Sequence, residues 1–191
     1  TFAKYVKTDS AQDVAQVAKW GVVVETKLDD LFETAYDNAT GTVQAANTYN
    51  ILAPGTTDKQ DDAFKISGTP EVAVNVNVEV DVKLTNWKLA NDTVYCPLVI
   101  SVNGTKYQID ATNTTTAKLE EAVEAAIREA LGHGNHDAKT NLNKTVNIAW
   151  EWPFYTNDDN DVKDTYLGNQ AEAGNAPTFG LDIKVTVTQV D

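Results

Sequence analysis

The residues with the clearest capacity for chemistry form an acidic run, "TNDDNDVKDT", at residues 156–165. Asn157, Asp159 and Asp161 alternate in the way that the oxygen ligands of a calcium loop do. The EF-hand pattern is incomplete, because Val162 stands where the loop needs glycine and no closing glutamate follows. The run therefore favours a solvated acidic loop, with a weak or intersubunit calcium site as the alternative hypothesis.

Other reactive residue types lack the partners that catalysis needs. His133 and His136 lie in "HGNH" without further ligands at metal-binding spacing, and the zinc-protease motif H-E-x-x-H is absent. Cys96, in "VYCPLVI", is interpreted as a buried thiol that behaves as a small apolar residue. No serine lies in a nucleophile-elbow pattern. We therefore predict a protein that is not an enzyme and has no certain cofactor, with calcium as the open alternative.

Five Asn-x-Ser/Thr sequons are candidate glycosylation sites: Asn38, Asn91, Asn103, Asn113 and Asn143. Asparagine and threonine are abundant in this chain, so several of these matches arise by chance. The sequons matter only if the source organism glycosylates exported proteins.

Charge and length limit the classes of partner. The 191 residues carry a formal charge of −13, which opposes binding to nucleic acid or to an anionic membrane surface. No stretch approaches 18 consecutive apolar residues, so no membrane span is predicted. The chain also contains no methionine, from which we expect a removed export signal and a secreted protein.

The elements that must position these residues are mostly strands. The segment "EVAVNVNVEVDVKL" (residues 71–84) alternates apolar and polar residues, which predicts a long strand with one buried face. Half-exposed strands of this kind belong to antiparallel sheets. The same alternation recurs around residues 20–24, 146–152 and 181–187, and Asn103-Gly104 predicts a tight hairpin turn.

One stretch, "TAKLEEAVEAAIREALGHG", departs from the strand pattern. Its large apolar residues recur at every fourth position: Leu119, Val123, Ile127 and Leu131. This stripe predicts an amphipathic helix over about residues 116–131, with Gly132 as its stop. "LDDLFETAY" (residues 28–36) also allows a second, shorter helix. The whole pattern predicts a mostly β protein, a jelly-roll-like antiparallel β-sandwich with one inserted amphipathic helix.

The first residues form a short β-like strip before the polar stretch "KTDSAQD" at residues 7–13. The strip contains four candidate polymerisation residues: Phe2, Ala3, Tyr5 and Val6. A polar spacer would free the strip to pair with an open sheet edge of another copy. We predict a donor strand with its spacer over residues 1–13 and one β-sandwich domain over residues 14–191. The alternative is a first strand that pairs within its own chain.

Taken together, these segments resemble a known family. The start, "TFAKYVKTDSAQDVAQVAKWGVVVE", is similar to that of secreted proteins of the TasA/camelysin family, which carry SipW-type signal peptides. The resemblance continues through "LAPGTTDKQDDAFKISGTPEVAVNVNVEV", "VNIAWEWPFYTNDDNDVKDTYLGNQA" and "FGLDIKVTVTQVD", and covers nearly the whole chain. These motifs are short and structural, so they specify a family better than an activity.

The resemblance implies a jelly-roll domain at the cell surface or in a biofilm matrix. It also implies head-to-tail filaments in which the N-terminal strand of each subunit completes the sheet of its neighbour. The expected partner is the chain itself, with an anchor or accessory filament protein as a further partner. Some family members are described as metallopeptidases, but this sequence has no recognisable protease metal site.

A second class of function stays open, a monomeric secreted adhesion module that binds calcium or a glycan. Trp150 and Trp152 are candidate glycan-binding residues, because aromatic faces stack on sugar rings. Both residues share the strand face of Val146 and Ile148, so filling of the core is the favoured interpretation.

Overall fold

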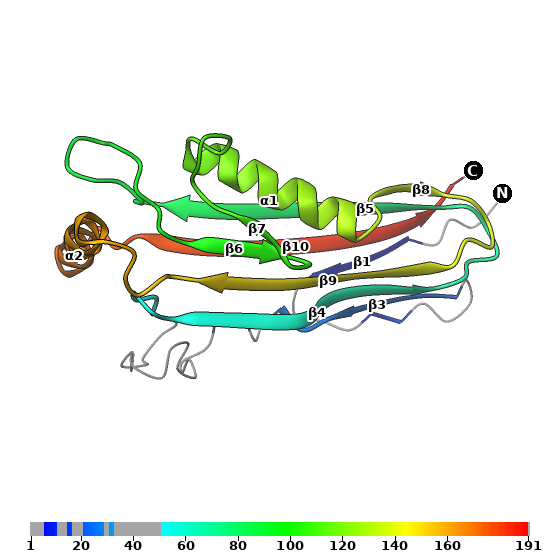
Figure 1. Cartoon of the computed structure of the whole chain (residues 1–191). Helices are drawn as coiled ribbons and strands as arrows, with labels where there is room; N and C mark the ends of the chain where they lie inside the picture. Colours follow the sequence, from blue (N-terminus) through cyan, green and yellow to red (C-terminus); the bar gives the residue numbers. More distant parts are fainter. Residues whose placement is uncertain (1–5, 11–14, 17–20, 29–30, 33–50, 191) are drawn as a thin grey trace.

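Strands are the main regular element of the computed structural model, which describes residues 6–10, 15–16, 21–28, 31–32 and 51–190 (Figure 1). The elements in chain order are β1 (Val6–Ser10), β2 (Ala15–Gln16), β3 (Val22–Thr26), β4 (Thr57–Gly68), β5 (Val74–Thr85), β6 (Val99–Val102), β7 (Thr105–Tyr107), α1 (Thr116–Ala130), β8 (Gly134–His136), β9 (Leu142–Glu151), α2 (Asp158–Glu172) and β10 (Thr178–Gln189).

The strands form two antiparallel sheets. One sheet has four strands in the order β1-β10-β5-β8, and the other has six in the order β2-β3-β4-β9-β6-β7. All the pairings between these strands are antiparallel. The predicted mostly β fold, an antiparallel β-sandwich with an inserted helix, is confirmed.

The longest ladder joins β5 and β10 along the whole length of both strands, from Thr178 opposite Thr85 to Gln189 opposite Val74. The alternation that predicted β5 is confirmed, because its apolar residues are buried: Val74, Val76, Val78, Val80, Val82 and Leu84. Burying one face of each strand in this way is the main driving force for closing the two layers.

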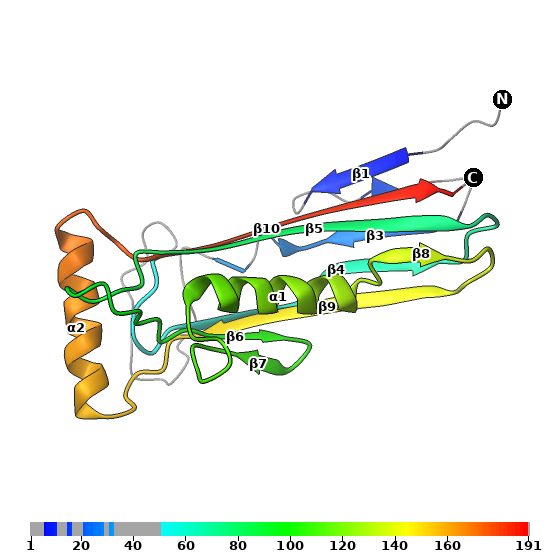
Figure 2. The same cartoon turned by 90° about the horizontal axis from the view of Figure 1, so that it is seen from above.

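Helix α1 confirms the predicted amphipathic helix. The Thr115 side chain caps its first turn by accepting a hydrogen bond from the Lys118 amide, at 3.2 Å. The four predicted stripe residues are all buried: Leu119, Val123, Ile127 and Leu131. The helix lies along β5 in both views and also contacts β6, β7 and β9 (Figures 1 and 2).

Two turns depend on backbone conformations with positive φ. Asn103 and Gly104 join β6 to β7 with φ of 48° and 82°, as the predicted hairpin turn requires. Gly68, at φ 113°, lies so close to β3 that a Cβ would come within 1.5 Å of the Gly21 carbonyl oxygen. The pairing of β3 with the end of β4 therefore requires glycine at residue 68.

The second, shorter helix allowed at residues 28–36 falls mainly on residues 29–30 and 33–36, which lie outside the described residues. In the part of the chain that is described, no helix is both long and apolar enough to cross a bilayer.

Candidate functional site

The N-terminal strand pairs within its own chain. β1 lies antiparallel to β10, from Val6 opposite Thr188 to Ser10 opposite Lys184. Residues 7–10 were predicted as part of a polar spacer, and that interpretation is wrong because they belong to this strand. The physical reason is that the unpaired backbone groups of a sheet edge accept a partner strand whatever the polarity of its side chains.

The other predicted donor residues, Phe2, Ala3 and Tyr5, lie outside the described residues, and Val6 is the first residue of β1. The predicted boundary after residue 13 also lies outside them, since residues 11–14 are not described. The donor strand therefore stays a prediction.

β1 covers only part of the β10 edge. Its partners are residues 184–188, whereas β10 extends over residues 178–189. On this side, no described strand pairs with Thr178–Ile183. Among the described residues, no strand ladder uses this side of the stretch, and a partly paired edge of this kind is where a strand can be added.

The opposite edge of the same sheet is covered. β8 pairs with residues 74–76 of β5, and side chains from α1 and the residues after it bind the backbone beyond that point. Glu120 accepts from the Leu84 amide at 2.7 Å, and Glu124 accepts from the Val82 amide at 3.0 Å.

Two further contacts continue this row of side chains along β5. Arg128 donates to the Val80 carbonyl at 3.4 Å, and His133 Nδ1 accepts from the Val78 amide at 3.0 Å. The spacing matches, because four helical residues rise about 6 Å and two strand residues rise about 6.7 Å. α1 therefore replaces a neighbouring strand with side-chain hydrogen bonds.

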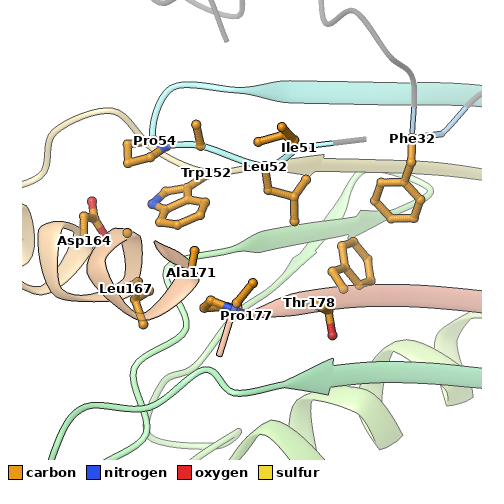
Figure 3. A pocket seen from close by; sticks show the side chains of 14 residues that line it. Phe32, Ile51, Leu52, Pro54, Trp152, Asp164, Leu167, Ala171, Pro177 and Thr178 are labelled. Carbon is orange, nitrogen blue, oxygen red and sulfur yellow. The ribbon is translucent and has the colours of Figure 1, made fainter. Parts of the chain in front are cut away.

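A pocket of about 570 Å³ lies where β10 begins (Figure 3). This is the end of the sandwich that carries α2 (Figure 1). Its walls come from α2, from residues 51–54 and from the start of β10. Phe32 and Trp152 close it from the side of the second sheet (Figure 3). The sequence did not predict this pocket, because its walls come from segments far apart in the chain.

One end of the pocket is polar. The Asp164 carboxylate, half-buried on α2, accepts a hydrogen bond of 2.8 Å from the Tyr95 hydroxyl. Burial raises the pKa of Asp164, and the Tyr95 hydroxyl and the Trp152 indole N–H partly oppose this increase. Burial, followed by the neighbouring Asp164, raises the pKa of Tyr95 as well. The Trp152 N–H faces the carboxylate without reaching hydrogen-bond geometry.

The acidic run is helical. Asn157 caps the start of α2 by accepting from the Asn160 amide at 2.9 Å, and Asp159 pairs with Lys163. The prediction of a solvated loop is therefore wrong, since acids in a first helical turn interact favourably with the helix dipole. In a helix, Asp159 and Asp161 point to different sides, so the predicted alternation of ligands is lost.

Calcium binding at these residues stays a prediction. Among the described residues, no group of three His, Cys, Asp or Glu side chains is placed to hold a metal ion. The signal for α2 that the sequence did contain was an asparagine cap before several acids. Its apolar residues form no stripe, and only Leu167 is buried.

The sequons occupy different settings. Asn38 lies outside the described residues, whereas Asn91 and Asn143 are exposed and Asn113 is partly exposed. Asn103 is exposed in its hairpin turn, but its side chain bonds the Thr145 carbonyl and the Asn147 amide. Glycosylation at any of these positions stays a prediction.

Cys96, Trp150 and Trp152 belong to the hydrophobic core. Burial raises the pKa of the Cys96 thiol to about 12, as expected for an unreactive apolar residue. Trp150 and Trp152 are 1% and 6% exposed, so the interpretation as core residues is confirmed. His136 belongs to β8 and contacts the Gly132 carbonyl through Nε2 at 2.6 Å.

No protein-family model, no curated protein and no solved structure matches this chain. The family resemblance of the sequence therefore stays a prediction.

Proposed function

We propose that this protein is a structural subunit of an extracellular, cell-surface filament, of the kind found in a biofilm matrix. In this filament the N-terminal strand of each copy completes a sheet of the next copy. The observation that carries the proposal is the partly paired edge of β10: on the side away from β5, no described strand pairs with Thr178–Ile183. The resemblance to secreted filament-forming proteins supports the same function.

The register of β1 explains how one segment can serve two copies. Val6 lies opposite Thr188, and β10 ends one residue later, at Gln189. If this ladder continued toward residue 1, it would pass the end of β10 in the same chain after one more residue pair. In the proposed filament, residues 1–5 continue onto the next copy and pair with its Thr178–Ile183.

The shape of the molecule suits head-to-tail contact. β1 starts at the end of the sandwich opposite α2, whereas β10 starts beside α2 (Figures 1 and 2). The start of β1 and the proposed accepting stretch of β10 therefore lie toward opposite ends of an elongated molecule. A contact between two different surfaces does not close on itself, so its repetition produces a fibre.

The accepting end also carries exposed apolar surface. The large apolar or aromatic side chains exposed in the described part of the chain are Ile51, Phe154, Tyr155 and Val162. Ile51 lines the pocket beside α2, Phe154 and Tyr155 lie just before α2, and Val162 lies on it. Exposed apolar groups on and near α2 therefore add apolar surface at the accepting end, as is typical of an interaction surface.

The energy of such a contact is sufficient. Each fully buried apolar anchor contributes about 1.5–3 kcal/mol, and each net ladder hydrogen bond contributes about 0.5–1.5 kcal/mol. Two or three anchors and about six bonds therefore exceed the several kcal/mol that association and ordering cost.

Deletion of residues 1–5, which retains β1, tests the proposal. We expect the truncated chain to form no filaments in electron microscopy, because it has no donor segment. Added in small amounts to the full chain, it should shorten the filaments, since a truncated copy accepts a strand but cannot donate one. As a control, Lys4→Ala keeps the donor backbone and should leave filaments intact. Filaments of normal length from the truncated chain would refute strand donation.

The pairing of β1 with its own β10 favours the second candidate, a monomeric secreted adhesion module that binds calcium or a glycan. Analytical ultracentrifugation separates the two functions. An adhesion module stays near 20.8 kDa at every concentration, whereas a filament subunit does not.

A further inference from the structure

The pocket beside α2 combines apolar walls with one polar end, and the proposed strand pairing leaves that polar end, Asp164 and the Trp152 indole, unused. Leu167 and Ala171 lie on the α2 wall (Figure 3). Gly168 from α2 and Phe179 from β10 also line the pocket. Its volume of about 570 Å³ is that of a site for a small organic molecule.

The indole N–H of Trp152 has no hydrogen-bond partner in the described part of the chain, although the residue is only 6% exposed. The neighbouring buried indoles differ from it. Trp87 donates to the Thr178 carbonyl at 2.8 Å, and Trp150 donates to the Leu31 carbonyl at 3.1 Å. A buried donor without a partner is unusual, because losing water without gaining a hydrogen bond costs free energy.

This donor lies beside an acceptor. The nitrogen of Trp152 is at the side of the ring that faces Asp164 (Figure 3). Asp164 uses one oxygen, Oδ1, to accept the hydrogen bond from Tyr95. A group in the pocket beside Trp152 and Asp164 therefore meets an N–H donor and a carboxylate acceptor together.

Three common polar groups fit this end of the pocket differently. A hydroxyl accepts from the indole and donates to the carboxylate, so it satisfies both. An ammonium group is attracted by Asp164, but it only donates and so leaves the indole without a partner. A carboxylate would be repelled by Asp164 and by the acids in the first turn of α2: Asp158, Asp159 and Asp161.

We propose that this pocket binds a small apolar molecule that carries one hydroxyl group, with the hydroxyl in the pocket beside Trp152 Nε1 and Asp164. The apolar body lies against α2, residues 51–54 and the start of β10. This binding activity goes beyond the proposed filament function and does not depend on it.

The probes for a test are 4-butylphenol, butylbenzene and 4-butylbenzoate, added to the full chain under conditions where it is monomeric. The readout is the indole N–H resonance of each tryptophan in ¹⁵N-labelled protein. We expect saturable binding of 4-butylphenol, at least about tenfold tighter than that of the other two compounds, since one added hydrogen bond is worth about this factor. The Trp152 resonance should shift, whereas that of Trp150, which already has a partner, should not.

Gly168→Leu supplies a variant that fills the pocket without disturbing the fold. A Cβ at residue 168 meets nothing within 4 Å, and leucine favours a helix more than glycine does. We expect this variant to lose 4-butylphenol binding at least about tenfold. Asn169→Leu is the matched control, because Asn169 is exposed on the same helix and does not line the pocket; it should bind as the unaltered chain does.

Asp164→Asn tests the polar end, and we expect it to reduce the preference for 4-butylphenol over butylbenzene. Equal binding of these two compounds to the unaltered chain would overturn the assignment of a hydroxyl site. Undiminished binding to Gly168→Leu, or the absence of saturable binding of any probe, would overturn the pocket itself. None of these results depends on whether the chain forms filaments.

Discussion

Tyr95 and Tyr155 form the same hydrogen bond in different surroundings. The Tyr95 hydroxyl donates to Asp164 and the Tyr155 hydroxyl donates to Asp158, each at 2.8 Å. Tyr95 is half-buried against α2, whereas Tyr155 is 59% exposed. Because water competes for exposed groups, only the Tyr95 contact should contribute measurably to stability.

Tyr95→Phe should lower the free energy of unfolding by about 1 kcal/mol, because it leaves the half-buried Asp164 without this donor. Tyr155→Phe, the matched control, should produce no measurable change. Urea unfolding monitored by tryptophan fluorescence measures both variants. Equal losses would mean that burial does not decide the strength of these contacts.

The same substitution should change the response to high pH. The pKa of Tyr95 is raised in the folded protein, so the phenol ionises first in the unfolded chain. The stability that Tyr95 contributes is therefore complete below its ordinary pKa of 10 and is lost as the pH rises above that value. Tyr95→Phe should remove this part of the alkaline decrease, and Tyr155→Phe, which is exposed, serves as the comparison.

At the scale of elements, α1 gives the four-stranded sheet two different edges. Its side chains bind the backbone of β5 on one edge, whereas part of the β10 edge has no described partner strand. Covering an edge in this way prevents unwanted pairing with other chains. In the proposed filament, the added strand therefore pairs at the β10 edge and not at the β5 edge.

Replacing both Glu120 and Glu124 with alanine should expose the amides of Leu84 and Val82. Each loses a hydrogen bond to a carboxylate, so we expect hydrogen exchange at these two amides to accelerate at least about tenfold. Replacing Glu121 and Glu129 makes the same change in charge on the exposed side of α1 and should leave both rates unchanged. Unaltered protection in the first variant would show that another group covers this edge.

At the scale of the whole molecule, charge opposes the proposed assembly. Each copy carries a formal charge of −13, and stacking copies head to tail brings these charges together. Salt weakens this repulsion, since the screening length decreases from about 30 Å at 0.01 M ionic strength to about 10 Å at 0.1 M.

Filament growth followed by light scattering should therefore accelerate as sodium chloride is raised across this range. The chain without residues 1–5 provides the baseline. Calcium chloride at matched ionic strength tests the calcium hypothesis separately, because a specific site would accelerate growth beyond the effect of sodium. Slower growth at higher salt would contradict a repulsive contact.

The sequence by itself determined the elements whose signal is local. The alternation of residues 74–84, the apolar stripe of residues 119–131 and the Asn103-Gly104 turn each specify one conformation from neighbouring residues alone. Together they were sufficient to predict a β-sandwich with an inserted helix.

Only the tertiary structure decided which residues meet. α2 has a cap and acidic first turn but no apolar stripe, so its helical conformation could not be separated from an acidic loop. The pairing of β1 with β10, the cover of α1 over β5 and the pocket near Trp152 join segments far apart in the chain. Periodicity shows which face of an element is apolar. It does not show which other element will pack against that face or pair with that edge.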